Sequence, residues 1–466
     1  MTFRNSIAVK WYAVVFCGVL SAAFIAAQPD ALLAGQAIEG EQRKGDPERG
    51  RDYLLHGGYI GAGIPIQLWR AMNAFTPPVD SPLQRRDTDP TVPIEMNQYT
   101  SHRGVEVVSG LNCLGCHATE FRGEFIIGLG NTTRDWTSGT DGATDAAELA
   151  GLLLANNPKA LREMRLFLEG AAVIEGKAAT PFRGPNPAFR LEEVSAAYRD
   201  PATLARVDQP VFHVNDTVVA SDVPPLWNVR KKTSLYYNGM GRGDFARLIQ
   251  QIGMVLIEDA DEAHAIKPGM RDVIAFLETL EPPDFPDPID RTLADAGAEI
   301  FAARCSGCHG TYGESETYPN LRLAASVVGT DPLYAQTLQE SGLIDWFAES
   351  WFAGGGDAYA EPEIAYVAPP LDGVWATAPY FHNGSVPTLL GVLDSTVRPK
   401  RWTRSFQTRV EDYDLRNVGW LHTETEERGP EVYDTAVPGY GNGGHVFADD
   451  LTGDERAALL EYLKTL

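Results

Sequence analysis

Two short stretches decide how this sequence folds and which group it attaches. They are Cys113-Leu114-Gly115-Cys116-His117 and Cys305-Ser306-Gly307-Cys308-His309. Each has the form C-x-x-C-H, the attachment signature of c-type haem. The spacing suits that chemistry, because two thiols three residues apart can each form a thioether to a haem vinyl group. The adjacent histidine then lies beside the iron as its proximal ligand. We therefore expect two covalent c-type haems, attached through the four cysteines and ligated by the two histidines.

Other uses of paired cysteines explain these stretches less well. A structural disulfide or a thioredoxin-like redox pair does not require a histidine directly after the second cysteine, and neither accounts for a duplicate. A zinc site would need both pairs to converge on one metal ion.

The start of the chain has the pattern of a secretory signal. Arg4 and Lys10 precede an apolar run from Trp11 to Ala27 that ends in small residues. Cleavage after Ala27 would remove Cys17 and leave four cysteines in the mature chain. The alternative is an uncleaved anchor helix, although a run of about 17 residues is short for a bilayer. We expect a periplasmic or secreted protein with no stable membrane insertion after cleavage, which agrees with haem attachment outside the cytoplasm.

The composition is that of a globular, acidic protein. Of 466 residues, 44% are hydrophobic and 22% are charged, and 39 basic against 63 acidic residues give a net charge of −24. Such a chain repels phosphate backbones, so nucleic acid is excluded as a partner. A small basic redox protein, such as a cytochrome or a cupredoxin, would be attracted instead. Loss of Arg4 and Lys10 with the signal changes −24 to −26.

Similar segments flank the two motifs and indicate an internal duplication. Residues 104–108 before the first motif and 297–301 before the second each predict a short helix. Similar helix ends follow at 276–280 and 462–466. The last helix begins at Thr452 with a capping box to Glu455.

We therefore expect a mostly α fold with two elaborated cytochrome c domains, long irregular loops and little β structure. The proline-rich stretch 281–288 cannot continue a helix and is the expected linker. The expected order is a signal at 1–27, an irregular extension at 28–100, an N-terminal domain at 101–283 and a C-terminal domain at 289–466.

The second haem has a clear candidate for its distal ligand. His445 lies in the glycine-rich loop 439–447, seven residues before Thr452, and no methionine follows Met270. Ligation by His309 and His445 is therefore our first choice, since glycines let a backbone approach a flat cofactor. His382 is the rival ligand, and His422 is a weaker one.

The first haem has no equivalent candidate. The corresponding loop offers only His264, and Met240 and Met254 are the nearest thioethers. Met254 lies in an apolar run, where methionine commonly fills a core. Met240 lies in a glycine-rich loop that could face a haem. We therefore expect an open or weakly occupied distal site, and a reactive haem, at His117.

The stretch from Leu371 to Pro387 resembles the second-domain signature of bacterial di-haem cytochrome c peroxidases, whose superfamily includes the di-haem enzyme of methylamine utilisation. Four further segments are most similar to the branch that contains the di-haem rubber oxygenases: 112–117, 127–131, 222–227 and 439–447. The resemblance implies a pair of mostly helical cytochrome c domains. In that branch the N-terminal haem binds oxygen and the C-terminal haem is ligated by two histidines.

The resemblance also assigns individual residues. Thr377 and Pro379 match positions whose carbonyls help to hold a calcium ion between the haems of the peroxidases. Trp227 matches an aromatic residue over the reactive haem of the rubber oxygenases, whereas no phenylalanine match occurs near Met240. The peroxidases place a methionine on the electron-transfer haem, and this chain has none there.

Two residues are left with alternative roles. Trp227, like Trp375, relays electrons, lines the distal pocket or simply packs in a core. His382 is a distal acid or base, or an anchor for its own turn.

Three functions remain open at this stage. The first is an oxygenase acting on a hydrophobic organic substrate, with dioxygen or peroxide activated at the N-terminal haem. The second is a cytochrome c peroxidase that takes electrons from a small cytochrome. The third is a non-catalytic di-haem electron carrier.

Overall fold

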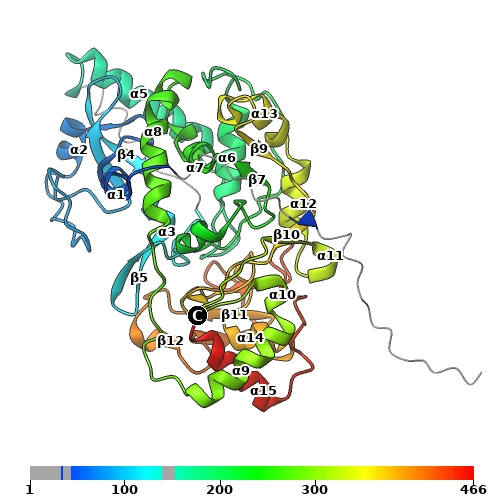
Figure 1. Ribbon diagram of the computed structural model, residues 1–466. Coiled ribbons are helices and arrows are strands. Elements are labelled where there is room, and N and C mark those ends of the chain that lie inside the picture. Colours follow the sequence, from blue (N-terminus) through cyan, green and yellow to red (C-terminus); the bar gives the residue numbers. More distant parts are fainter. Residues whose placement is uncertain (1–32, 35–43, 139–152) are drawn as a thin grey trace, which may run out of the picture.

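The computed structural model describes residues 33–34, 44–138 and 153–466 (Figure 1). The expected signal at 1–27 lies outside the described residues. Helices account for 36% of the structure and strands for 15%, in several small sheets. Helix is the larger share, but the prediction of little β structure is wrong. Many of the segments between the helices form short paired strands, because buried backbone groups need hydrogen-bond partners.

The N-terminal half consists of β1 (Leu33–Ala34), α1 (Pro47–His56), β2 (Gly63–Pro65), α2 (Ile66–Met72), β3 (Met96–Thr100), β4 (Glu106–Leu111), α3 (Leu114–His117), β5 (Ala118–Phe121), β6 (Glu124–Ile127), α5 (Pro158–Ile174), α6 (Ala188–Ala197), the 3₁₀ helix η3 (Leu226–Lys231), β7 (Gly241–Gly243), α7 (Phe245–Ile249), η4 (Gln250–Val255) and α8 (Ala260–Leu277). The stretch 281–288 contains neither helix nor strand.

The C-terminal half consists of α9 (Arg291–Arg304), α10 (Ser306–His309), β8 (Leu321–Ala324), α11 (Ala325–Val328), α12 (Leu333–Glu340), α13 (Leu343–Glu349), η5 (Trp351–Ala353), β9 (Ala358–Ala360), β10 (Ala365–Val367), η6 (Val374–Ala376), α14 (Leu389–Leu393), η7 (Ser395–Val397), β11 (Arg401–Arg404), η8 (Val410–Asp412), β12 (Tyr413–Asp414), β13 (Gly419–Trp420), β14 (His422–Glu424), β15 (Tyr433–Asp434) and α15 (Gly453–Leu463).

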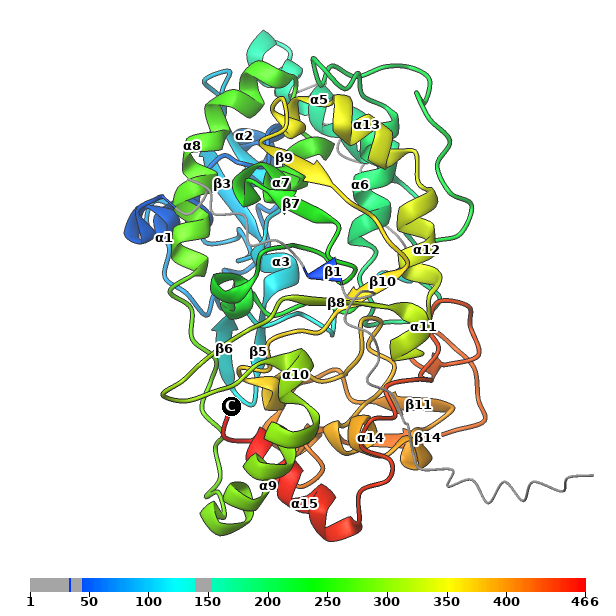
Figure 2. The same cartoon turned by 45° about the vertical axis from the view of Figure 1, so that its right-hand side comes forward.

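Helices α9 and α15 cross next to the second haem motif (Figure 2). Gly297 permits the close approach, because a Cβ there would lie 2.0 Å from the carbonyl oxygen of Ala458. The capping box of α15 is confirmed: the Thr452 hydroxyl accepts from the Glu455 backbone N–H, and the Glu455 carboxylate accepts from the Thr452 N–H. The terminal helix of this half is therefore positioned as its sequence predicts.

The same crossing recurs in the N-terminal half, between α1 and α8. Gly50 takes the place of Gly297, since a Cβ there would lie 1.8 Å from the carbonyl oxygen of Asp272. Asp46 caps α1 by accepting from two backbone N–H groups, and Pro47 opens the helix. The two halves thus share this mode of helix packing, with α1 and α8 in the places of α9 and α15.

Two expectations about this region are wrong. Residues 104–108, expected to be a helix, lead into and form part of β4, where β-branched Val107 and Val108 pair with β2 and β3. The described part of 28–100, expected to be irregular, holds α1, β2, α2 and β3. An insertion separates α1 from its haem motif, whereas α9 runs directly into the second motif.

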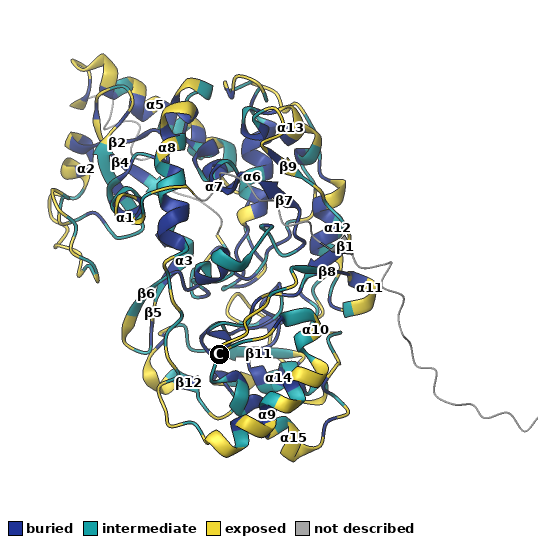
Figure 3. Ribbon diagram, viewed as in Figure 1, coloured by how far each residue is buried: buried dark blue, intermediate teal, exposed yellow. Residues whose placement is uncertain are grey.

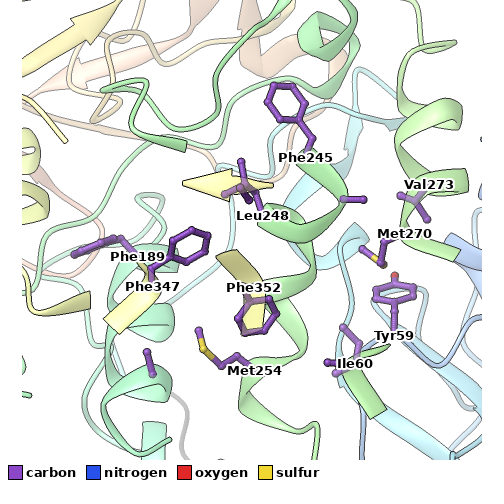
Figure 4. Packing of buried hydrophobic residues seen from close by; sticks show 14 of the residues in the cluster. Tyr59, Ile60, Phe189, Phe245, Leu248, Met254, Met270, Val273, Phe347 and Phe352 are labelled. Atoms are coloured by element: carbon purple, nitrogen blue, oxygen red, sulfur yellow. The ribbon is translucent and has the colours of Figure 1, made fainter. Parts of the chain in front are cut away.

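The two largest clusters of buried side chains draw residues from both halves of the chain. One cluster surrounds α1, α6, α7 and α8 and includes residues of α12, α13 and β9 (Figure 4). The other surrounds α9 and α15 and includes Phe121, Leu129 and Trp227 from the N-terminal half. Exposed residues gather on the outer faces of α9 and α15 (Figure 3). The halves therefore interlock instead of meeting at a simple boundary.

None of the helices within the described ranges is long and apolar enough to span a bilayer.

Candidate functional site

Both C-x-x-C-H stretches form the same tight helical turn. The backbone N–H of His117 donates to the Cys113 carbonyl at 2.9 Å, and that of His309 donates to the Cys305 carbonyl at 3.0 Å. The four cysteines of these motifs are free thiols. Burial raises the pKa of Cys113 to about 12 and that of Cys305 to about 11, which favours the thiol over the thiolate. The pairs are therefore available for thioether formation and are not spent on disulfides.

A backbone carbonyl fixes the tautomer of His309. Its Nδ1 lies 2.8 Å from the carbonyl oxygen of Pro369. A carbonyl only accepts, so Nδ1 carries the proton and Nε2 keeps a free lone pair, which is the arrangement of a metal-ligating imidazole. Burial lowers the pKa of His309, which keeps the ring neutral.

Pro224 holds the matching position at the first motif. Burial lowers the pKa of His117 to about 4, and the Pro224 carbonyl partly opposes this change. The contact is looser than its counterpart, since Nδ1 of His117 makes no full hydrogen bond within the described residues. Both carbonyls belong to a repeated tripeptide, Pro-Pro-Leu, at 224–226 and 369–371. This repeat can be recognised in the sequence and marks the carbonyl that faces the histidine of each motif.

The His445 ring faces His309. The two ring centres are 6.3 Å apart, with planes at 65°. Two metal–imidazole bonds of about 2 Å each, plus about 1 Å from each ring centre to its nitrogen, span about 6 Å. The separation therefore fits one metal atom between the rings. Burial, together with His309 and Arg398, lowers the pKa of His445 to about 4, so this ring is also neutral.

Three side chains hold the loop that carries His445. Arg398 donates to the carbonyls of Asn442 and Gly444 at 2.9 and 2.7 Å. Asp331 accepts from the N–H groups of Gly439 and Gly441, both at 3.1 Å. Asn383 donates to the carbonyls of the same two glycines. The candidate ligand is thus fixed by partners far away in sequence, which sequence reasoning missed.

Position 444 requires glycine, because its backbone lies close to that of Gly329. Its φ is +74°, and a Cβ there would lie 2.1 Å from the carbonyl carbon of Gly329. His445 also has a positive φ of 48°, and its N–H donates to the Val328 carbonyl at 2.6 Å. The loop therefore seats against the end of α11.

The two rivals for the second haem lie elsewhere. The His422 ring packs against Trp402, with centres 6.1 Å apart. His382 is buried among three tyrosines: its ring stacks on Tyr366 at 4.2 Å, and the rings of Tyr334 and Tyr237 are 6.0 and 6.4 Å away. Burial lowers the pKa of His382 to about 3. Nε2 of His382 lies 3.1 Å from the Tyr366 hydroxyl, and the His382 carbonyl accepts from the Asp222 N–H at 2.7 Å.

His117 has no imidazole facing it among the described residues, which include all nine histidines of the chain. His264 is exposed on α8 and does not reach the site. Met254 is fully buried in the core, as expected for a packing residue, and Met240 is buried in the same cluster as Leu114 of the first motif. The two motifs therefore differ: one has a paired imidazole and the other does not.

Trp227 connects the two backbone turns that face His117 and His309. Its indole N–H donates to the Asp372 carbonyl at 2.8 Å, and Asn228 donates to the Pro370 carbonyl at 3.1 Å. Lys231 adds an ion pair to the Asp372 carboxylate at 2.6 Å. Thus η3, directly after the first Pro-Pro pair, is tied to the turn that follows the second. Trp375 packs nearby and donates to the Pro283 carbonyl.

The turn at Thr377 and Pro379 contains a cis peptide bond between Ala378 and Pro379. The Thr377 hydroxyl donates to the Val374 carbonyl at 3.0 Å, and Pro379 borders a hollow that also includes Arg404. No group of three or more His, Cys, Asp or Glu side chains suited to a metal occurs within the described ranges. A calcium ion here would depend on carbonyl oxygens.

Comparison with known proteins gives a partial match. The family described as RoxA-like, cytochrome c-like matches residues 365–403, a span that contains Pro369, Thr377 and His382. Two uncharacterized proteins of Sinorhizobium fredii are similar: y4iJ is 32% identical over 40% of this chain, and y4iM is 27% identical over 53%. The chain spans 41% and 64% of those curated relatives. It therefore carries a RoxA-like, cytochrome c-like segment, and such a segment implies c-type haem.

Proposed function

We propose that the protein is an exported di-haem c-type oxidoreductase that oxidises a hydrophobic organic substrate, with dioxygen or peroxide activated at the N-terminal haem. The observation that carries this proposal is the asymmetry of the two motifs. The His309 ring has a partner imidazole 6.3 Å away, whereas no imidazole faces His117 within the described part of the chain. Paired imidazoles suit electron transfer, and a position without a protein ligand suits chemistry.

The residues present fit the cofactor. Four free thiols lie in two C-x-x-C-H turns, and the Nδ1 of His309 is oriented by a carbonyl. Cys113 and Cys116 would hold one haem with His117 as ligand, and Cys305 and Cys308 would hold the other with His309 and His445. A bound c-type haem supplies an iron that changes its oxidation state and binds a small oxidant where a coordination position is free.

The remaining chemistry depends on the chain itself. The carbonyl of Pro369 orients the imidazole of His309, and the carbonyl of Pro224 faces His117, while burial keeps both rings neutral. Trp227 supplies a buried aromatic ring between the two supports and is our candidate for the route of electrons between the haems. The carbonyls of Thr377 and Pro379 would hold a calcium ion between the haems. A small basic redox protein suits the acidic chain as a partner.

Cyanide titration of the purified holoprotein tests this proposal. The Soret bands of the two haems are distinguished by setting the solution potential so that only one haem is reduced. We expect cyanide to shift the band of the His117 haem and to leave the His309 haem unchanged. Oxygen uptake that depends on an added hydrophobic substrate would then support the oxygenase. Peroxide-dependent consumption of a reduced small cytochrome would instead favour the peroxidase. If cyanide perturbs neither band, the protein is an electron carrier and the proposal fails.

A further inference from the structure

Four exposed apolar side chains belong to segments that meet at His445. Val446 and Phe447 follow it directly in the chain and are 53% and 49% exposed. Val397 and Val327 come from two other segments and are 46% and 59% exposed. Large apolar side chains grouped on a surface commonly mark a contact site for another molecule.

Hydrogen bonds bring these segments together. The N–H of His445 donates to the carbonyl of Val328, which directly follows Val327 in α11. Arg398, which directly follows Val397, donates to the His445 carbonyl at 3.3 Å. The exposed apolar residues therefore lie around one candidate haem ligand, although they are far apart in the sequence.

Phe447 connects this surface directly to the candidate ligand. The centre of its ring lies 5.1 Å from that of His445, with the two planes at 86°. The rest of the Phe447 side chain is open to solvent, since about half of it is exposed. An exposed aromatic ring thus lies against one of the two imidazoles that face each other at the second motif.

The attachment turn of the second motif is also open to solvent, unlike that of the first. Gly307 is exposed, and a Cβ there would meet nothing within 4 Å. Gly115 holds the equivalent position in the first motif, where it is buried and a Cβ would lie 2.4 Å from the Leu111 side chain. The second haem site is therefore the one that another protein can approach closely.

The surface next to these apolar residues is acidic. Segments 310–320 and 446–455, which follow His309 and His445, contain six acidic residues and no lysine or arginine: Glu314, Glu316, Asp449, Asp450, Asp454 and Glu455. All of them except Asp449 are exposed. Arg304 lies beside them, and its charge is offset by an ion pair with Asp450 at 2.6 Å. Apolar side chains with acidic neighbours suit a basic protein, whereas a second copy of this acidic chain or an anionic membrane would be repelled.

We propose that this surface docks a small basic redox protein, which exchanges one electron with the haem held by His309 and His445. Val446 and Phe447 form the centre of the contact. The partner's metal and the iron change oxidation state by one in opposite directions, and no bond or proton moves. A small patch of this kind suits a transient complex. The inference locates the partner of the proposed function, on which it rests for the second haem but not for the oxidation of a substrate.

Anaerobic stopped-flow oxidation of the fully reduced holoprotein by ferric mitochondrial cytochrome c tests this inference. The probe is small and basic, and its histidine–methionine ligation favours electron flow from a haem with paired histidines. We expect the second-order rate constant to fall about tenfold or more when the ionic strength rises from about 10 mM to about 150 mM, because salt screens the attraction.

A lysine at the centre of the surface should weaken this attraction. Val446→Lys should lower the rate constant at low salt about tenfold. Val410→Lys is the matched control, because Val410 is also a valine, is 52% exposed, and directly precedes β12, away from α11 (Figure 1). It should change the rate constant less than about twofold. An equal effect of the two variants, or a rate that does not depend on salt, would overturn the proposal.

Two further measurements separate docking from damage to the haem. Benzoquinone, a small neutral oxidant, should oxidise the wild-type protein and Val446→Lys at the same rate, and their low-spin spectra should agree. If Val446→Lys alters the spectrum, Val397→Lys places the same charge on a different segment and decides the test: it should slow cytochrome c, and an unchanged rate would overturn the proposal.

Analytical ultracentrifugation tests the alternative occupant. A wild-type dimer that Val446→Lys separates would show that a second copy of the chain covers this surface, which contradicts the proposal, whereas a monomer agrees with it. These measurements report electron exchange and association, not turnover. A missing oxygenase activity would therefore refute the proposed function and leave the docking result intact.

Discussion

The indole N–H of Trp227 donates to the carbonyl oxygen of Asp372 at 2.8 Å and so joins the two halves of the chain. Trp227 follows the Pro-Pro-Leu turn whose first carbonyl faces His117, and Asp372 follows the turn whose first carbonyl accepts from His309. Asp372 thus lies beside the turn that orients His309, and Trp227 lies beside the turn that faces His117. The two candidate haem sites therefore share one rigid support.

Substitution of this tryptophan should separate its electronic role from its structural one. Trp227→Phe removes the hydrogen bond to Asp372 and reduces the conjugated ring, so we expect slower electron equilibration between the haems and a loss of about 1–3 kcal/mol of stability. Stopped-flow reduction monitored at both Soret bands measures the rate. Trp402→Phe is the control, because Trp402 donates to the Ser385 carbonyl in a different cluster. Equal effects of both variants on the rate would argue against a route through Trp227.

The repeated helix crossing predicts a matched pair of destabilised variants. A methyl group at Gly50 or Gly297 would lie within about 2 Å of a backbone carbonyl oxygen, so the helices must move apart. We expect Gly50→Ala and Gly297→Ala each to cost about 1–3 kcal/mol in urea denaturation. Gly453→Ala, where a Cβ meets nothing within 4 Å, should change stability by less than about 0.5 kcal/mol. If Gly50→Ala leaves the stability unchanged, the close packing of α1 against α8 is contradicted.

The raised pKa of Glu192 predicts that the stability of the fold decreases as pH rises. Its pKa is raised to about 7 by burial, above the value of about 4.3 in an unfolded chain. The folded state therefore holds the proton more tightly, and its stability falls as pH rises from about 4.5 to 7. The facing groups Tyr236 and Tyr334 keep their protons in this range, because burial raises the pKa of both.

The difference between wild type and Glu192→Gln isolates this contribution. Across the pH window the difference in unfolding free energy should change by roughly 2–3 kcal/mol, in the direction that makes wild type relatively less stable at pH 7. Urea denaturation at four or five pH values measures it. Parallel stability curves for the two proteins would show that the carboxyl titrates at its ordinary pKa.

Removal of His445 should affect one haem only. His445→Ala deletes the ring that faces His309, so we expect the low-spin ferric spectrum of that haem to become high-spin in near-infrared magnetic circular dichroism. His422→Ala is a matched control, since that ring packs on Trp402. A spin change in His382→Ala with none in His445→Ala would move the ligand to the other histidine.

The sequence predicts the parts of this structure that depend on local signals. The C-x-x-C-H turns and the capped helix α15 depend on short-range geometry and are legible from residue types alone. The pairing of His445 with His309 follows from the loop position, but its support by Asp331, Asn383 and Arg398 is non-local. Helix α1 was missed because an insertion hides its relation to the haem motif, although Asp46-Pro47 is a clear start signal.

Local sequence patterns do not predict how the two halves interlock. The segment that holds α12, α13 and β9 belongs by sequence to the second half, yet it packs in the core of the first. Glu192 of α6 and Phe347 of α13 border one hollow, although they come from the two different halves of the sequence. The Pro-Pro-Leu repeat at 224–226 and 369–371 is the one local sequence signal for the two carbonyls that face His117 and His309.

The distal coordination of the two irons tests the central claim most directly. Electron paramagnetic resonance of the oxidised holoprotein, recorded before and after addition of cyanide, reports both sites in one experiment. We predict one low-spin signal of paired imidazoles that cyanide leaves unchanged, and a second ferric signal that cyanide converts. Two low-spin signals, neither of which responds to cyanide, would contradict the asymmetry between His117 and the His309–His445 pair.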